Sequence, residues 1–283
     1  MGIKNVTLLG TGVLGAQIAF QTAYCGFNVT SYDIDDEKIS MARQTMEGIG
    51  QAYLKDLPDA TPQKIAETVA RIGFATDLGE AVKHADLVIE AIPEILDLKN
   101  KVYAELGKVA PAKTIFATNS STLLPSDMAA ATGRPKQFLA LHFANYIWLH
   151  NTAEIMGHPD TDPAVFSEIV NFAKDIGMVP IEVKKEQPGY VLNSLLVPFL
   201  RAAADLLIND VASVEDIDRT WKIATGSPAG PFEVYDAVGL NTAYNISKHG
   251  DEGSRKFADY IKENYIDKGK MGVASGEGFY KYP

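Results

Sequence analysis

One histidine and one glutamate lie where two apolar segments would otherwise form only core. In "LHFANYIWLHNTAEIM", residues 141–156, His142 ends one apolar run and Glu154 lies inside the next. A carboxylate that reaches an imidazole holds its tautomer and stabilises the imidazolium that forms when the ring takes up a proton. The pair is therefore a candidate general acid and base. A core histidine satisfied by a backbone carbonyl is the alternative that the residues leave open.

Polar residues also follow a second apolar segment. "TNSST" (118–122) comes directly after "TIFA" and supplies Asn119, Ser120 and Ser121. Their amide and hydroxyl groups can hydrogen-bond a substrate oxygen and a nicotinamide. The alternative for these residues is capping of the helix that "LPSDMAA" indicates.

A third group of polar residues lies in "EAIPEILDLK", residues 90–99, which follows another apolar segment. From this position Glu94 and Lys99 are expected to face the riboses of a cofactor. Their alternative is a solvated first turn of a helix.

Three glycines indicate a phosphate-binding turn. Gly10, Gly12 and Gly15 form G-x-G-x-x-G between an apolar strand pattern and a helical pattern. Gly10 permits the tight turn, Gly12 lets the backbone approach a pyrophosphate, and Gly15 lets helix and strand pack closely. The phosphate is then expected on the N–H groups of the helix N-terminus, at Val13 and Leu14. The alternative is a glycine turn that serves packing alone.

Asp33 supports the cofactor interpretation of that turn. It lies at the tip of the next expected strand, at the spacing from Gly15 that is typical of dinucleotide-binding units. A carboxylate there accepts hydrogen bonds from a ribose 2′-OH and repels a 2′-phosphate. The sequence therefore predicts NAD rather than NADP as the cofactor.

The elements that must position these residues alternate along the first part of the chain. Strands are expected at 3–9, 28–33, 86–91, 114–118, 138–143, 152–157 and 178–184, with helical stretches, such as 13–25, between most of them. Such alternation is typical of an α/β fold with an open, mainly parallel, twisted sheet, whose ligands bind at the carboxyl ends of the strands. Residues 36–72 interrupt it with two amphipathic helices, which predict a helical hairpin insertion.

The pattern changes after "KKEQPG", residues 184–189. Only helices are expected beyond it, at 190–209, 214–225, roughly 230–249 and 253–267. The Pro-Gly pair and the change of period predict a domain boundary near 187, with a first domain over 1–186 and an all-α domain over 187–283.

Composition restricts the class of protein. The chain has 283 residues, 46% hydrophobic and 22% charged, with a net charge of -10, which disfavours a nucleic-acid or anionic-membrane partner. The single cysteine, Cys25, excludes an intramolecular disulfide and suits a reducing compartment. No apolar run reaches ~18 residues, and no leader pattern begins the chain. These features predict a cytoplasmic protein, and no residue spacing indicates a metal site.

Taken together, the motifs resemble those of the L-3-hydroxyacyl-CoA dehydrogenase family, which includes bacterial 3-hydroxybutyryl-CoA dehydrogenases. "GTGVLGAQIA" with its later aspartate, "EAIPEILDLK", "TNSST", "LHF", "QPGYVLNSLLVPFLRAA", "SPAGPFEVYDAVGLNT" and "GEGFYKY" agree with the family in order and spacing. The resemblance covers nearly the whole chain. It implies a Rossmann-type NAD-binding domain followed by an all-α domain that binds substrate and forms a homodimer.

The resemblance also implies roles for single residues. His142 is expected to be the acid/base and Glu154 its partner, while Ser121 and Asn193 bind the substrate oxygens. Lys55, near the tip of the helical hairpin, is a candidate contact for the CoA part of a substrate. The implied activity is the reversible, NAD-dependent oxidation of a short-chain L-3-hydroxyacyl-CoA, such as 3-hydroxybutyryl-CoA, to the 3-ketoacyl-CoA.

Two departures from the family pattern concern the substrate. The family continues its histidine segment as H-F-F-N-P, whereas this chain has Ala144 and Tyr146 at the second Phe and the Pro. The hairpin that should clamp CoA is poor in Lys and Arg near its tip, where Asp56 and Asp59 oppose its lysines. A dehydrogenase of free hydroxy acids or sugar acids, resembling gulonate dehydrogenases, is therefore one alternative. A non-catalytic NAD-binding protein, as among the family's crystallin relatives, is the other.

Overall fold

The computed structural model describes residues 2–282, which form two compact units that meet at the Val191–Leu192 bond. The break lies a few residues beyond the boundary near 187 that the sequence pattern predicts. No helix within the described residues is long and apolar enough to cross a membrane.

The first unit is built on one eight-stranded sheet in the order β3-β2-β1-β4-β5-β6-β7-β8. Its strands are β1 (Asn5–Leu9), β2 (Asn28–Tyr32), β3 (Ile72–Ala75), β4 (Leu87–Glu90), β5 (Ile115–Thr118), β6 (Phe138–Phe143), β7 (Thr152–Met156) and β8 (Val179–Val183). Strands β1 to β6 run parallel, β7 pairs antiparallel to β6, and β8 runs parallel to β7. The mainly parallel sheet that the sequence predicts is therefore confirmed.

Helices cover the sheet, and their apolar faces bury its strands. They are α1 (Val13–Tyr24), α2 (Asp36–Asp56), α3 (Pro62–Ala70), α4 (Leu78–Val82), α5 (Leu96–Val109), α6 (Ser126–Ala129) and α7 (Pro163–Asp175), with the 3₁₀ turns η1 (Ala130–Thr132) and η2 (Pro135–Gln137). Strand residues such as Leu8, Ile89 and Leu139 are fully buried. Burial on both faces explains why these strands read as continuous apolar runs.

The sequence pattern misses one strand, β3. Its four residues, "IGFA", come directly after the hairpin helices and pair with β2 at the edge of the sheet. Such a short segment cannot show a period, so only its pairing partner defines it as a strand.

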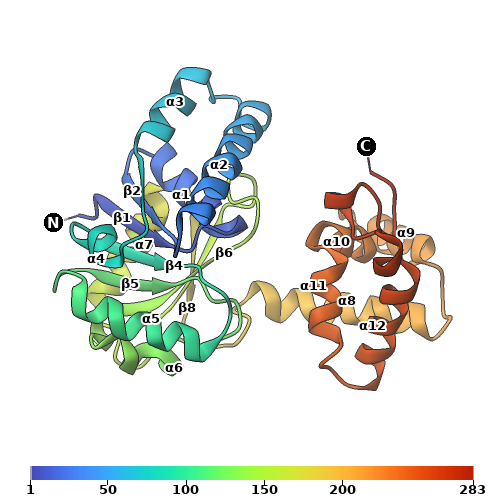
Figure 1. Cartoon of the computed structure of the whole chain (residues 1–283). Coiled ribbons are helices and arrows are strands. Elements are labelled where there is room, and N and C mark those ends of the chain that lie inside the picture. Colours follow the sequence, from blue (N-terminus) through green and yellow to red (C-terminus); the bar gives the residue numbers. More distant parts are fainter. Residues whose placement is uncertain (1, 283) are drawn as a thin grey trace. The chain divides into compact units, whose positions relative to one another are not determined.

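The helical hairpin insertion is present as α2 and α3, which pack on α1 and extend away from the sheet (Figure 1). Each helix begins at a side chain that accepts a hydrogen bond from its first turn. Asp35 accepts from the backbone N–H of Lys38, and Thr61 accepts from that of Lys64. The Thr61 cap, with Pro62 in the first turn, explains why a new helix begins directly after the "LPDAT" turn.

The second unit is all helical, as the sequence predicts. Its elements are α8 (Leu192–Ile208), α9 (Val214–Thr225), α10 (Pro231–Val238), α11 (Leu240–Ser247) and α12 (Glu252–Asn264), with η3 (Ile266–Lys268) and η4 (Val273–Ser275). The single helix expected over 230–249 is wrong, because Gly239 adopts φ +93° and separates α10 from α11. A positive φ is incompatible with a continuing helix, and glycine adopts it without steric cost.

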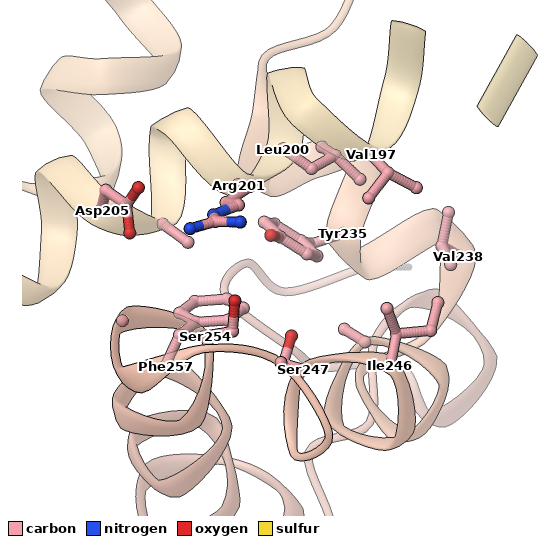
Figure 2. A pocket seen from close by; sticks show the side chains of 14 residues that line it. Val197, Leu200, Arg201, Asp205, Tyr235, Val238, Ile246, Ser247, Ser254 and Phe257 are labelled. Atoms are coloured by element: carbon pink, nitrogen blue, oxygen red, sulfur yellow. The ribbon is translucent and has the colours of Figure 1, made fainter. Parts of the chain in front are cut away.

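An apolar groove of about 240 Å³ lies among α8, α10, α11 and α12 of the second unit (Figure 2). Leu200, Tyr235 and Phe257 line it, together with the exposed side chains of Val197 and Ile246. At its rim, Arg201 forms an ion pair with Asp251.

A buried aspartate fastens the end of the chain to the second unit. Asp236 is 1% exposed and accepts hydrogen bonds of 2.9 Å from the backbone N–H groups of Phe279 and Tyr280 and from the hydroxyl of Tyr282. A Cβ placed on Gly278 would lie 2.0 Å from Oδ1 of Asp236 and 2.8 Å from the backbone of Gly272. The "GEGFYKY" segment therefore needs glycine at 278 so that the carboxylate can approach.

We expect Gly278→Ala to lower the free energy of unfolding by about 1–3 kcal/mol, because the added methyl group overpacks a buried site that three donors hold in place. Gly48→Ala is the matched control, since Gly48 is exposed within α2 and a Cβ there meets nothing within 4 Å. It should leave stability unchanged or raise it by up to about 1 kcal/mol. Urea unfolding measures both variants, and equal midpoints would contradict this account of the C-terminal segment.

Candidate active site

His142 and Glu154 face each other across the only antiparallel pairing among the described strands of the sheet. They are direct partners in the β6–β7 register, and Nδ1 of His142 lies 2.9 Å from Oε2 of Glu154. Both are nearly fully buried, at 4% and 3% exposure. The hairpin geometry thus places a carboxylate against the imidazole, because directly opposed residues have neighbouring side chains.

The second ring nitrogen of His142 meets Ser121, at 3.2 Å from Nε2 to Oγ. An ionised Glu154 only accepts hydrogen bonds, so it selects the tautomer with the proton on Nδ1. Nε2 of the neutral ring then accepts from the Ser121 hydroxyl. Glu154 thus orients His142, and Nε2 of His142 is left as the base. The Ser121 hydroxyl lies at the nitrogen that would exchange a proton with a substrate.

Two neighbouring residues that the sequence pattern does not single out complete the surroundings of the pair. The ring of Tyr190 stacks on the imidazole, with 4.6 Å between centroids and 11° between planes. The backbone N–H of Val191 donates to Oε1 of Glu154 at 2.9 Å. The only sequence signal for these two residues is the preceding Pro-Gly pair. It predicts a turn, but it does not predict that the turn packs against β6 and β7.

Glu94 organises the turn that carries Ser121. Its Oε1 accepts from the hydroxyl of Ser120, from the backbone N–H of Ser121 at 3.0 Å and from both the N–H and the hydroxyl of Thr122 at 2.9 Å. Burial alone would raise the pKa of Glu94, but the bonds from Ser120 and Thr122 and the charge of Lys99 outweigh it and hold that pKa below its usual value. The carboxylate stays charged, which keeps these donors in place.

Lys99, which the sequence pattern expects to face a cofactor ribose, is buried beside two carboxylates. Its side chain is 1% exposed, and its Nζ lies 2.5 Å from Glu90 and 3.4 Å from Glu94. Glu90, which is fully buried, also accepts from the hydroxyls of Tyr103 and Thr118. The ammonium is therefore a buried counter-ion beneath Glu94, because a desolvated carboxylate requires one.

The glycine turn has the geometry of a phosphate-binding loop. Gly10 adopts φ +94°, and a Cβ on Gly15 would lie 2.1 Å from the carbonyl oxygen of Gly10. Gly12 precedes α1 without a side-chain cap, and a Cβ on it would meet nothing within 4 Å. The first N–H groups of α1, from Val13 and Leu14 onward, thus begin beside open space, where an anion is stabilised.

Asp33 lies at the carboxyl end of β2 and contacts the same turn. Its Oδ2 accepts from the N–H and the hydroxyl of Thr11, at 2.9 and 2.7 Å, and its Oδ1 accepts from the N–H of Ile34. The carboxylate is thereby fixed beside the phosphate loop. This position fits the ribose of a dinucleotide whose pyrophosphate rests on α1.

The remaining expected site residues lie in three places. Asn119 follows β5 and accepts from the backbone N–H of Phe143 at 3.0 Å, so it links the β5 turn to the end of β6. Asn193 is the second residue of α8 and belongs to the second unit. Lys55 is exposed in the last turn of α2.

The unusual loop after His142 is held by two contacts to the helices beside it. Tyr146 adopts φ +58°, and its N–H donates to Oε1 of Gln17 in α1 at 2.7 Å. The indole N–H of Trp148 donates to Asp56 at 2.9 Å. Asp56, which lies near the lysines of the hairpin in the sequence, thus also anchors this loop.

The whole chain matches two successive domains of one known family. Residues 5–187 match the NAD binding domain of 3-hydroxyacyl-CoA dehydrogenase, and residues 189–282 match its C-terminal domain. The mitochondrial hydroxyacyl-coenzyme A dehydrogenase of Rattus norvegicus is 35% identical over 99% of this chain and 91% of its own length. A probable 3-hydroxybutyryl-CoA dehydrogenase of Bacillus subtilis is 31% identical over 100% and 98%.

Solved structures agree with this match. A structure described as substrate-directed dual catalysis of dicarbonyl compounds by diketoreductase has a TM-score of 0.97 and 60% identity, with both chains covered fully. The (S)-3-hydroxybutyryl-CoA dehydrogenase of Ralstonia eutropha has a TM-score of 0.84 and 29% identity, again over both whole chains.

We expect Lys99→Met to lower the free energy of unfolding by about 3–5 kcal/mol, because it leaves the charge of Glu90 buried without a counter-ion. Lys101→Met on the exposed face of the same helix is the control and should change stability by less than about 0.5 kcal/mol. Thermal unfolding by circular dichroism distinguishes them. A Lys99→Met protein as stable as its control would show that the ammonium is not a structural counter-ion.

Proposed function

The chain belongs to the 3-hydroxyacyl-CoA dehydrogenase family, and on this premise we propose that it interconverts a 3-hydroxy compound and its 3-keto partner with His142 as acid and base. As a member of this family it is an NAD-dependent dehydrogenase with a Rossmann-type domain. The observation that carries the proposal is the buried contact of Glu154 with His142, whose other nitrogen meets Ser121.

When bound, NAD⁺ would accept a hydride at C4 of its nicotinamide in oxidation, and NADH would supply it in reduction. In oxidation, Nε2 of neutral His142 removes the proton of the substrate hydroxyl; in reduction, the imidazolium returns it to the carbonyl oxygen. Glu154 stays ionised and keeps the ring oriented for both directions. Ser121 donates to the substrate oxygen and stabilises the charge that develops there. The family resemblance gives the same role to Asn193 of the second unit. The Oδ1 of Asn119 accepts from the N–H of Phe143. We assign its Nδ2 as a donor to the carboxamide of the cofactor.

Two substrate classes share the chemistry that this site can perform. A 3-ketoacyl thioester carries its ketone two carbons from the thioester carbonyl, so it is a 1,3-dicarbonyl compound like a free diketone. The family relationship favours a short-chain 3-hydroxyacyl-CoA, such as 3-hydroxybutyryl-CoA. We take this CoA ester as the first candidate.

A substrate without CoA is the second candidate, whether a free dicarbonyl compound, a hydroxy acid or a sugar acid. It is favoured by the hairpin, where Lys64 pairs with Asp59 at 2.8 Å and Asp56 binds Trp148. Lys55, exposed in the last turn of α2, is then the candidate cation left for a CoA phosphate. The 60% identity to a structure described for dicarbonyl catalysis by diketoreductase supports the same candidate.

The test of function is oxidation of NADH with acetoacetyl-CoA, with free 1,3-diketones and with 3-keto acids. The loss of NADH absorbance measures the rate. We expect turnover with at least one class, and the larger kcat/KM identifies the substrate class. His142→Gln should reduce kcat about 10²–10⁴-fold with that substrate, because it removes the proton carrier.

Binding of NADH, measured by its fluorescence, should be unchanged in His142→Gln. If the wild-type protein binds NADH and turns over none of these compounds, it is a binding protein rather than an enzyme for this class. Near-normal turnover by the variant would instead remove His142 from the mechanism.

We also propose that the protein forms a homodimer through its second unit and acts in the cytoplasm. The apolar groove among α8, α10, α11 and α12 supports the dimer, because Val197, Val238 and Ile246 leave 42%, 42% and 56% of their surfaces exposed. Bacterial relatives support the location, although mitochondrial relatives exist. A second copy of the chain is the partner that would cover this groove.

Ile246→Glu should convert the dimer to a monomer, because it brings a charge into an apolar contact. Ile223→Glu is the control, since Ile223 is 78% exposed on α9 and does not line the groove. Sedimentation velocity measures the mass of each protein. A monomeric wild-type protein, or an Ile246→Glu variant that remains dimeric, would contradict the groove as the dimer contact.

A further inference from the structure

The turn before α8 has an unusual backbone. Gly189 and Tyr190 adopt φ +81° and +53° in succession. For a bulky side chain a positive φ is a genuine outlier, and such conformations persist only where surrounding contacts impose them. The contacts that impose this one lead to the acid/base pair.

The first contact is the stack on His142. The Tyr190 ring is 1% exposed, and its centroid lies 4.6 Å from that of the imidazole, with the two ring planes nearly parallel. Glu154 and Ser121 contact the two ring nitrogens. Hydrogen bonds to ring nitrogens are directed along the plane of the ring, so these two contacts constrain rotation about the axis between the nitrogens only weakly. An aromatic face parallel to the ring opposes that rotation.

The second contact ties the same tyrosine to the serine turn. The Tyr190 hydroxyl donates to the backbone carbonyl of Ser120 at 2.7 Å, and the next residue along the chain carries the hydroxyl that meets His142. His142, the serine turn and Tyr190 therefore each contact the other two. In addition, the turn directs the N–H of Val191 at Oε1 of Glu154, so one short segment supports both members of the pair.

We propose that Tyr190 is a positioning residue for the reaction: its ring sets the plane of the His142 imidazole, and its hydroxyl fixes the distance between that ring and the Ser121 turn. The role rests on the proposed function, because it matters only if His142 exchanges a proton with a substrate. Misplacement of a reacting group by about 1 Å can cost on the order of 10²-fold in rate.

The phenol keeps its proton, so the bond to Ser120 persists. Burial raises the pKa of Tyr190 well above its usual value, and the charges of Glu94, Glu154 and Glu90 raise it further. A neutral hydroxyl is the only form that can donate to a carbonyl.

Two variants separate the ring from the hydroxyl. Tyr190→Leu removes both, and kcat should fall about 10–100-fold while the affinity for NADH stays within twofold of wild type. Tyr190→Phe keeps the stack and removes only the bond to Ser120, so it should restore most of kcat and leave a loss of about two- to fivefold. Tyr53→Phe, a fully buried tyrosine whose hydroxyl donates to Gln21, is the matched control and should retain wild-type kcat.

Several results would overturn the proposal. One is a wild-type kcat in Tyr190→Leu, and another is a loss that lies wholly in NADH affinity. If Tyr190→Leu does not fold, Tyr190→Phe decides: a kcat equal to that of Tyr53→Phe contradicts the role of the hydroxyl, and a reduced kcat with unchanged NADH affinity supports it.

A spectroscopic measurement separates this inference from the proposed function. With Nδ1 protonated against Glu154, the two ring nitrogens of His142 have widely separated ¹⁵N shifts, which His142→Gln assigns among the five histidines. Tyr190→Leu lets the imidazole tilt away from Glu154 and weakens the bond from Nδ1 that selects the tautomer, so these shifts should move toward the average of the two tautomers. Tyr190→Phe keeps the stack and should leave them unchanged. Unchanged shifts in Tyr190→Leu refute the positioning role, whereas absent turnover with changed shifts refutes only the proposed function.

Discussion

The register of one antiparallel strand pair is the constraint on which the rest of the site depends. Six strands of the sheet run parallel and end at one edge, where the glycine turn, Asp33 and the serine turn collect. Strand β7 then returns against β6, which places Glu154 directly opposite His142. A slip of one residue would point the carboxylate to the other face of the sheet, so the apolar core that fixes this register also fixes the chemistry.

Polar contacts connect the ends of the strands to the groups that must meet a substrate. Lys99 neutralises Glu90 and Glu94, Glu94 gathers the N–H groups of the serine turn, and that turn presents Ser121 to His142. Lys99 and Glu90 are buried and compensate each other, and the partly exposed Glu94 is compensated by Lys99 and by several donors. Removal of one partner therefore disturbs the next, which is the behaviour expected of a fully connected polar network.

The features that relate to substrate choice lie outside this network. The loop after His142 departs from the family pattern and is anchored by Gln17 and by Asp56, both on helices of the first unit. Ser121 is held by Glu94, and Glu154 accepts from the N–H of Val191. The proton-transfer groups and the loop thus have different anchoring residues, as expected of relatives that share a fold but differ in substrate.

The sequence by itself determined the order of strands and helices, the glycine turn, the acidic residue after β2 and the types of residue at the end of each strand, because these depend on local periodicity and spacing. It predicted His142, Glu154 and Ser121 as a group, but their distances follow only from strand pairing. Three features required the tertiary structure: the burial of Lys99, the strand β3, and the approach of Tyr190 and Val191 to the acid/base pair. Each depends on which segment packs beside it, and neither composition nor period encodes that.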